Sequence, residues 1–455
     1  MHPTFVVRSR SARPIWFVTA ATLRKIVGTL KAVDRAFVKA VGFEPRPGAH
    51  LVLPGGGVLF GIEAEGAHNN PFLPGQLAGV LPAGTYRFAN NPHDTRLAAL
   101  AFALGSYRFT RYRPAKDRGV RLSMPEGVDG AEITRIAEGV ALARDLINTP
   151  ANDLGPAELE AAARDLARRH RAKFRAIVGG ELLKQNFPLI HAVGRAADAK
   201  RAPRLIELRW GKASDPKITV VGKGVCFDTG GLDLKPESAM LIMKKDMGGA
   251  ASALALAHMV MDAGLAVSLR VLIPAVENSV AGDAFRPLDI YPSRKGFNVE
   301  IGNTDAEGRL ILADALALAD EESPDLLVDM GTLTGAARVA LGPELPPFYT
   351  DDEALADEVA RHAMAENDPS WRLPLWPRYE AMLDSKIADL NNVATGGMAG
   401  SIVCALFLKR FVSAAKSWLH FDIYAWTPAA RPGRPEGGEC QAARALYALL
   451  SARYG

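Results

Sequence analysis

The spacing of apolar residues divides the chain into two parts with different patterns. Up to about residue 118, short apolar runs alternate with Gly- and Pro-rich turn signals, which is typical of a small α/β unit. Residues 133–147 carry apolar side chains at helical spacing, so we predict a helix there. Asn148-Thr149-Pro150 ends this helix, because the residue before a proline disfavours the helical region.

After Pro150, predicted strands and helices alternate regularly. The strands are expected at 205–208, 218–221, 267–273 and 326–330, and the helices at 156–174, 247–263 and 306–321. Such alternation indicates an α/β fold with a mixed, largely parallel sheet flanked by helices, and sites in these sheets lie at the carboxyl ends of the strands. We therefore expect a smaller N-terminal α/β domain over 1–130 and a larger C-terminal domain over 131–455, which would carry such a site, with a linker helix at about 131–147.

Composition narrows the class of protein. With 455 residues, 48% hydrophobic and 23% charged, the chain is long enough for two or three folded domains. Its net charge of +4 is small and its basic residues are scattered, so nucleic acid is not an expected partner. Three cysteines (Cys226, Cys404 and Cys440) do not form a disulfide framework. Without a secretory signal or a membrane-length apolar segment, we expect a cytoplasmic protein.

Charged side chains gather after two of the predicted strands. The first group spans residues 222–235 and includes Lys223, Asp228 and Lys235, followed by Asp246 at the start of a helix. The second spans residues 302–310, again directly before a helix. Carboxylates hold hard divalent cations and catalytic zinc, and neighbouring lysine and arginine suit a developing oxyanion, so the combination favours metal-assisted hydrolysis.

Each of these residues also has a simpler interpretation. Asp246 and Asp305 could be helix N-caps, Glu307 could favour a helix dipole and pair with Arg309, and Lys235 could be an exposed loop residue. A phosphate-binding loop is not expected, because Gly-x-x-x-x-Gly-Lys-Ser/Thr is absent, and there is no His-Glu-x-x-His pair. Cys226, His258 and His420 are expected to be packed or supporting residues.

The combined motifs resemble the leucyl aminopeptidase family. The resemblance is carried by Val-Gly-Lys-Gly-Val-Cys-Phe-Asp-Thr-Gly-Gly (221–231), Leu-Lys-Pro (234–236), Asp-Met-Gly-Gly-Ala (246–250) and Asn-Thr-Asp-Ala-Glu-Gly-Arg-Leu (303–310). Gly-Thr-Leu-Thr-Gly-Ala (331–336) and Trp-Arg-Leu-Pro-Leu (371–375) are also similar. The resemblance covers roughly residues 140–450 and is weak over residues 1–120.

The resemblance implies a role for each site residue. Two divalent ions, manganese or zinc, would be held by Lys223, Asp228, Asp246, Asp305 and Glu307, with Asp228 and Glu307 bridging. Lys235 would steady the tetrahedral intermediate, and Arg309 would hold a bicarbonate that acts as general base. The substrate's first side chain would meet Met243, Thr332, Leu333 and Gly335.

The implied activity is removal of N-terminal residues from peptides by attack of a metal-bound water. The implied assembly is a homohexamer. Tyr424-Ala425-Trp426-Thr427 stands where family members usually carry small residues, so a reshaped pocket without a leucine preference is expected. Two alternatives stay open at this point: a non-enzymatic DNA-binding scaffold on the same fold, or a dipeptidase such as a Cys-Gly hydrolase.

Overall fold

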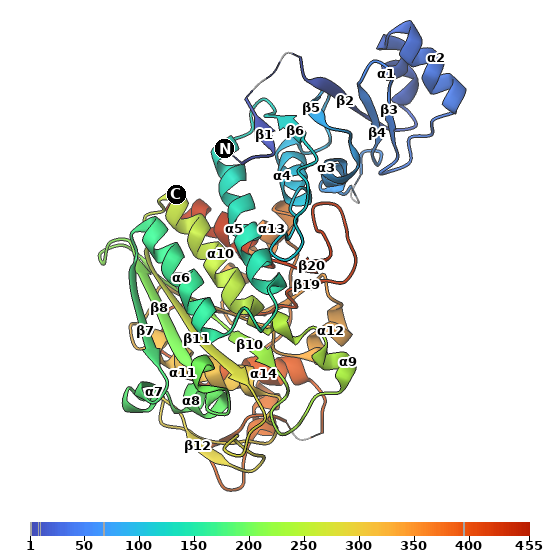
Figure 1. The fold of residues 1–455 in the computed structure, drawn as a ribbon. Coiled ribbons are helices and arrows are strands. Elements are labelled where there is room, and N and C mark those ends of the chain that lie inside the picture. The colour runs from blue at the N-terminus through green and yellow to red at the C-terminus, as the bar shows by residue number, and fades with distance from the viewer. Residues whose placement is uncertain (1, 8, 10, 67–68, 395) are drawn as a thin grey trace. The chain divides into compact units, whose positions relative to one another are not determined.

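The computed structural model describes residues 2–7, 9, 11–66, 69–394 and 396–455. It separates into two compact units, Met1–Ala141 with Ala429–Glu436, and Leu142–Pro428 with Gly437–Gly455 (Figure 1). The segment 429–436 thus belongs to the first unit although it follows most of the second in sequence. The predicted helix over 133–147 is confirmed as α5 (Gly130–Asn148).

The first unit is built on a six-stranded sheet of order β1-β6-β5-β2-β4-β3. All neighbours in it are parallel except β3 and β4. Its strands are β1 (Phe5–Val6), β2 (Arg13–Val18), β3 (His50–Val52), β4 (Val58–Gly61), β5 (Gly84–Phe88) and β6 (Val120–Ser123). Its helices include α1 (Leu23–Thr29), α2 (Ala32–Val41), α3 (Leu77–Val80) and α4 (Thr95–Gly105).

The second unit contains a nine-stranded mixed sheet. Its strands, in the order of the sheet, are β16 (Trp371–Arg372), β15 (Pro347–Tyr349), β18 (Trp418–Asp422), β14 (Leu326–Gly331), β9 (Lys217–Gly222), β11 (Ser268–Asn278), β8 (Arg204–Trp210) and β7 (Lys173–Val178), with β10 (Gly224–Asp228) pairing to β11. The central strands β18, β14, β9, β11 and β10 run parallel, whereas β8, β7 and β15 pair antiparallel. The predicted mixed, largely parallel sheet is confirmed.

Two short sheets and several helices complete this unit. The small strands are β12 (Ile290–Pro292), β13 (Asn298–Glu300), β17 (Leu390–Asn391), β19 (Trp426–Thr427) and β20 (Gly437–Gly438). The helices are α6 (Pro156–His170), α7 (Glu181–Lys184), α8 (Pro188–Gly194), α9 (Glu237–Met240), α10 (Gly248–Ala263), α11 (Glu307–Asp320), α12 (Gly335–Leu341), α13 (Glu353–Ala365), α14 (Gly400–Lys409) and α15 (Ala443–Tyr454).

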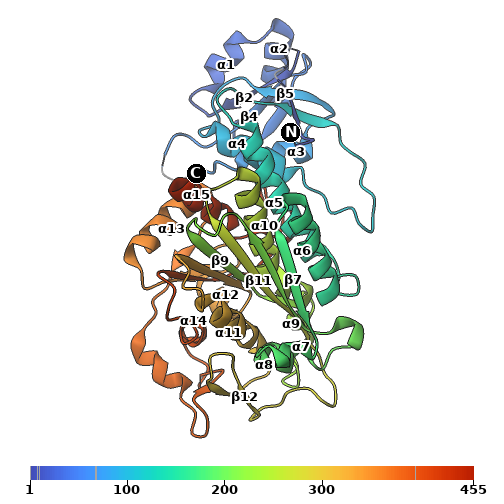
Figure 2. The same cartoon turned by 90° about the vertical axis from the view of Figure 1, so that its left-hand side faces the viewer.

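Helices cover both faces of the sheet (Figure 2). One layer contains α6, α10 and α15, and α10 packs on β9 and β14. The other contains α8, α11 and α14, whose apolar residues share one core with Val221 of β9 and Leu272 of β11. Because side chains alternate along a strand, each central strand contributes to both layers. Among the described residues, no helix combines the length and apolar character that a membrane crossing requires.

One helix, predicted over residues 156–174, is shorter in the structure. The helix that begins at Pro156 ends at His170, because Arg171 adopts a left-handed conformation with φ of 56°, and Phe174 lies in β7 instead. Lys173–Val178 alternates in burial, as expected of a strand at the edge of a sheet. The sequence interpretation followed helical spacing past the turn and missed this strand.

Candidate active site

The two charged segments of the sequence meet at the carboxyl ends of the central strands. Lys223 directly follows β9, and Asp228 is the last residue of β10. Asp246 lies in a short 3-10 helix (Met243–Met247) before α10, and Glu307 is the first residue of α11. The structure brings these side chains and Asp305 together, because β9, β10 and β14 are parallel and end at the same edge.

Lys223 lies at the centre of the buried half of the site. Its Nζ is 2.8 Å from Asp246 Oδ2, 2.8 Å from Glu307 Oε1 and 2.8 Å from the carbonyl oxygen of Thr332. A Cβ at Gly308 would come within 2.6 Å of this Nζ and 2.8 Å of Leu333 Cδ2, so any other residue there would displace the lysine amino group from this position. Burial by itself would lower the pKa of Lys223, but the carboxylates of Asp246 and Glu307 outweigh it and raise the pKa.

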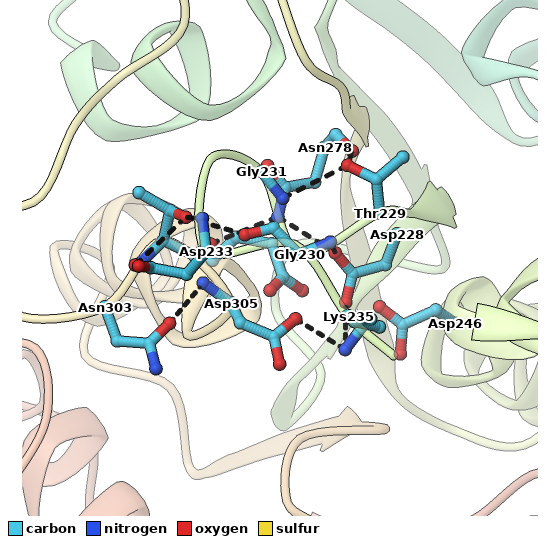
Figure 3. A network of polar contacts seen from close by, with 12 residues as sticks. Asp228, Thr229, Gly230, Gly231, Asp233, Lys235, Asp246, Asn278, Asn303 and Asp305 are labelled. Atoms are coloured by element: carbon cyan, nitrogen blue, oxygen red, sulfur yellow. Dashed lines mark hydrogen bonds and ion pairs between the residues drawn. The ribbon is translucent and has the colours of Figure 1, made fainter. Parts of the chain in front are cut away.

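Lys235 connects the other two carboxylates (Figure 3). Its Nζ lies 2.9 Å from Asp228 Oδ2 and 2.5 Å from Asp305 Oδ1. Its side chain is only 13% exposed, so the interpretation as an exposed loop residue is wrong. The loop that turns it inward passes through Gly230 at φ of +89°, a conformation that favours glycine. Burial lowers the pKa of Lys235, but Asp228 and its neighbours raise it by more.

Asn278 at the end of β11 is a residue that the sequence analysis missed. Its Nδ2 donates to Asp228 Oδ1 at 2.9 Å and to the Thr304 carbonyl oxygen at 3.1 Å. The backbone N–H of Gly230 donates to the same Asp228 oxygen at 2.8 Å. These two donors fix one carboxylate oxygen and leave the other facing Lys235 (Figure 3). A polar residue closing a long apolar strand was the available signal.

The electrostatics of the cluster indicate a missing positive charge. Carboxylate oxygens of Asp228, Asp305 and Glu307 lie within 4.8 Å of one another, and Glu307 is 1% exposed. Burial, and then repulsion from Asp228, raise the pKa of Glu307 to about 8 and that of Asp305 to about 6. Four carboxylates face two lysines, so a cation is the natural partner for this donor set.

The same oxygens also lack good hydrogen bonds. Asp246 Oδ2, Asp305 Oδ1 and Glu307 Oε1 are buried and, within the described part of the chain, accept no hydrogen bond of ordinary geometry, although lysine amino groups lie near them. Buried oxygens in this state suit direct coordination of a metal ion. The residues present therefore fit the divalent cations that the sequence resemblance implies.

The N-cap interpretation of the aspartates is wrong. The N-cap of α11 is Ala306 rather than Asp305, and the N-cap of α10 is Met247 rather than Asp246. Glu307 does occupy the first turn of α11, but its close cationic partner is Lys223. Arg309 donates instead from Nη1 to the carbonyl oxygen of Asn392 at 2.6 Å, and it is buried.

A cavity of about 370 Å³ opens beside the cluster. Its lining includes Lys223, Asp228, Lys235, Asp246 and Asp305 of the cluster. The four residues predicted to contact substrate, Met243, Thr332, Leu333 and Gly335, line the same cavity. Tyr424, which the sequence singled out as unusual, also lines it. Lys245 and Arg338 do so too and were not anticipated.

Lys245 differs from the other two lysines of the site. It is 5% exposed, and burial lowers its pKa to about 8 even though Asp246 is nearby. Cys226, His258 and His420 are all buried, in agreement with their predicted packing role. Burial raises the pKa of the Cys226 thiol well above its usual range, which makes it a poor nucleophile.

Comparison with known proteins agrees with this geometry. Residues 141–447 match the model of the cytosol aminopeptidase family, catalytic domain, and residues 13–125 match the M17 aminopeptidase N-terminal domain. A probable cytosol aminopeptidase of Roseiflexus castenholzii is 40% identical over 365 residues, which span 76% of this chain and 74% of that protein. Its counterpart in Rhodococcus opacus is 38% identical over 76% of this chain and 71% of its own length.

Solved structures give the same result across nearly the whole chain. The cytosol aminopeptidase of Coxiella burnetii superposes with a TM-score of 0.94 and 43% identity, covering 99% of this chain and 100% of that one. The bottromycin maturation enzyme BotP, in complex with Mn, superposes with a TM-score of 0.85 and 31% identity, covering 97% of this chain and 99% of that one. The fold and site define a metallopeptidase. The chain belongs to the cytosol aminopeptidase family, and it is an aminopeptidase and a hydrolase.

Proposed function

We propose that this aminopeptidase uses two divalent cations held by Lys223, Asp228, Asp246, Asp305 and Glu307. The observation that carries the proposal is the convergence of these five side chains from the two charged segments: four of them line one cavity, and Glu307 lies directly behind, against Lys223 and near Asp228 and Asp305. When bound, the cations would lower the pKa of a water molecule and polarise the first peptide carbonyl. The substrate's free amine would bind beside the carboxylates, which restricts cleavage to the first residue.

In the metal-free cluster, the amino group of Lys223 supplies positive charge between two carboxylates. It is protonated between Asp246 and Glu307, both 2.8 Å away. To act as a ligand it must lose this proton, which costs on the order of 4 to 5 kcal/mol at pH 7 for an ordinary lysine pKa and more for the raised pKa of Lys223 in the metal-free cluster. Structural zinc sites are worth about 10 to 16 kcal/mol, so metal binding can offset this cost.

Lys235 and Arg309 have proposed catalytic roles. Lys235 keeps its charge because Asp228 and Asp305 face it, and it lines the cavity, where it would stabilise negative charge on the carbonyl oxygen of the first peptide bond. No histidine lines the cavity among the described residues, so a general base must come from elsewhere. Arg309, close in sequence to Glu307, is proposed to hold a bicarbonate ion for that purpose.

The choice of metal and the setting of the enzyme complete the proposal. We expect Mn²⁺ or Zn²⁺, because carboxylates accept both, and the relative BotP has been solved with Mn. We also propose peptide substrates, a cytoplasmic location in line with the names of the relatives, and a homohexameric assembly in line with the sequence resemblance. Light scattering of the purified protein measures the last of these directly.

Metal analysis combined with a peptide assay tests the two-metal site. Purified enzyme, loaded with Mn²⁺ or Zn²⁺ and then desalted, is expected to retain two ions per chain and to release single N-terminal residues from short peptides. Treatment with a chelator should abolish hydrolysis, and re-addition of either ion should restore it. A stoichiometry of one or zero in an active enzyme would contradict the proposal.

A further inference from the structure

We propose that Lys245 and Arg338 form an acid-recognition wall that selects substrates whose N-terminal residue is aspartate or glutamate. This inference rests on the proposed function, since it assigns the substrate class of the same cavity. The wall is defined by Lys245, Arg338 and the ring of Tyr424, and all three line the cavity beside the carboxylate cluster.

Lys245 is a buried cation that forms no ion pair with any of the described acidic residues. It is 5% exposed, and no carboxylate in the described part of the chain lies within ion-pair distance of its Nζ. Its neighbour Asp246 directs Oδ2 to Lys223 and accepts the Thr332 hydroxyl on Oδ1 at 2.6 Å. The close contact of the Lys245 amino group is the ring of Tyr424, whose centroid is 4.6 Å away.

Arg338 offers a second donor to the same wall. Its Nη2 donates to the carbonyl oxygen of Asp422, whereas its Nη1 is buried and has no hydrogen-bond partner among the described residues. Its guanidinium carbon lies 5.7 Å from the centroid of the Tyr424 ring. The Arg338 side chain is 14% exposed and lines the cavity.

Asp422 compensates only one of the two cations of this wall, because its Oδ1 lies 3.4 Å from Arg338 Nη2 and no ion pair joins it to Lys245 among the described residues. Its carboxylate already accepts from the backbone N–H of Leu333 at 3.1 Å, and from the hydroxyls of Thr334 and Ser401 at 2.5 and 3.1 Å. It is 1% exposed and is absent from the cavity surface. One buried acid therefore faces two cations, and the cavity side keeps an excess of positive charge.

Tyr424 fixes the position of the wall. Its backbone N–H donates to Gln441 Oε1 at 2.8 Å, and its ring contacts both cations. A contact with an aromatic face offsets only part of the free-energy cost of burying a cation. An opposite charge that also forms hydrogen bonds offsets more of this cost. A substrate carboxylate would compensate the charge of Lys245 beside Arg338, whereas an aliphatic side chain would leave Lys245 without an opposite charge.

The cavity brings the acid-recognition wall and the proposed metal ligands to one space. Asp228, Asp246 and Asp305, beside which the free amine of a substrate would bind, line the same volume of about 370 Å³ as Lys245 and Arg338. An N-terminal aspartate or glutamate could therefore place its amine at the metal site and its side-chain carboxylate at the wall.

Isosteric substrates test this inference directly. The metal-loaded enzyme is assayed with arylamides of glutamate, glutamine and leucine, and kcat/KM for glutamate is expected to exceed that for glutamine by at least about tenfold. Lys245→Met is expected to reduce this ratio at least about tenfold, and Lys245→Arg to preserve most of it. Arg338→Gln should also reduce the glutamate-to-glutamine ratio. This second variant tests the wall independently if a Lys245 variant fails to fold.

Lys244→Met is the matched control. Lys244 is the preceding residue, but its Nζ donates to the carbonyl oxygen of Asn148 at 2.6 Å and lies over the Trp426 ring, outside the cavity lining. Removing this charge should leave the glutamate-to-glutamine ratio unchanged. An equal loss in both variants would show a general field effect and overturn the assignment to Lys245.

The remaining outcomes separate this inference from the proposed function. Cleavage of leucine arylamide with a glutamate-to-glutamine ratio near or below one overturns the acid-recognition wall and leaves the two-metal site intact. Absence of cleavage of every arylamide by the metal-loaded enzyme contradicts the two-metal proposal. A preference for Leu-Gly over Leu-Gly-amide that is lost in Lys245→Met would assign the wall to the C-terminal carboxylate of a dipeptide, and overturn the side-chain assignment.

Discussion

The amino group of Lys223 lies 2.8 Å from Glu307 Oε1, although Lys223 follows a strand in the first charged segment and Glu307 begins a helix in the second. Both side chains are almost fully buried. The contact depends on Gly308, because any Cβ there would displace the lysine. This pair is where the two sequence motifs become one site.

Glu307→Ala is expected to abolish hydrolysis of N-terminal amino-acid amides. The variant removes a buried carboxylate from the proposed two-metal site, so bound metal measured by elemental analysis should fall together with activity. Circular dichroism should show a folded chain, because the variant relieves repulsion between Glu307 and the neighbouring carboxylates of Asp228 and Asp246.

Glu353→Ala provides the control for a purely helical role. Glu353 is the first residue of α13, as Glu307 is of α11, but it is exposed and pairs with Arg372. The Glu353→Ala variant should have the same activity and the same metal content as the wild type. If Glu307→Ala keeps full activity, the proposed ligand role is wrong.

Lys235→Met should separate chemistry from metal binding. Lys235 is proposed to stabilise charge in the transition state, and the loss of one such donor commonly costs about 10² to 10³ in kcat. Because Lys235 also neutralises Asp228 and Asp305, its removal should leave metal affinity equal or stronger. Steady-state kinetics and a metal titration on the same preparation measure both; weaker metal binding would argue against this role.

Asn278→Ala should lower metal affinity and activity by removing a hydrogen bond that orients Asp228. Asn278 holds Asp228 Oδ1 at 2.9 Å and does not line the cavity. Loss of such a supporting contact typically costs 10- to 100-fold in metal affinity or activity. The exposed Asn152→Ala is the matched control and should behave as wild type. An Asn278→Ala variant with unchanged metal affinity and kcat would show that Asp228 is oriented by its backbone alone.

Asp314 should make stability depend on pH away from the active site. This carboxyl on α11 accepts the backbone N–H groups of Leu189 and Arg294, both at 2.8 Å. Burial, opposed by these hydrogen bonds, raises its pKa to about 7, whereas an unfolded aspartate titrates near ~3.9. The folded state binds the extra proton, so this stabilisation is complete below pH ~4 and is lost as pH rises through about 7.

Thermal unfolding of wild type and Asp314→Asn between pH 5 and 8 measures this effect. The stability of wild type relative to the variant should fall as pH rises, by a total on the order of a few kcal/mol, since each pKa unit is worth about 1.4 kcal/mol. The metal concentration is kept equal in both samples so that its own pH dependence cancels. A difference that stays constant, or grows with pH, would contradict the raised pKa.

Much of the catalytic fold could be predicted from the residues alone. The apolar runs that became β8, β9, β11 and β14, and the helices α10 and α11, were found within a few residues of their bounds, because buried central strands and helices have strong periodic patterns. The edge strand β7 was missed, because its half-exposed alternation continued a helical pattern without a clear break.

The sequence by itself determined which residue types stand at the strand ends, and through its motifs the family to which the chain belongs. Only the tertiary structure decided which of them meet. Asn278 behind Asp228, and Lys245 and Arg338 around Tyr424, come from separate elements, and no local pattern relates them. The physical reason is that charge, burial and hydrogen bonding in a site depend on distances across the sheet edge, which the chain fixes only when its parallel strands pair.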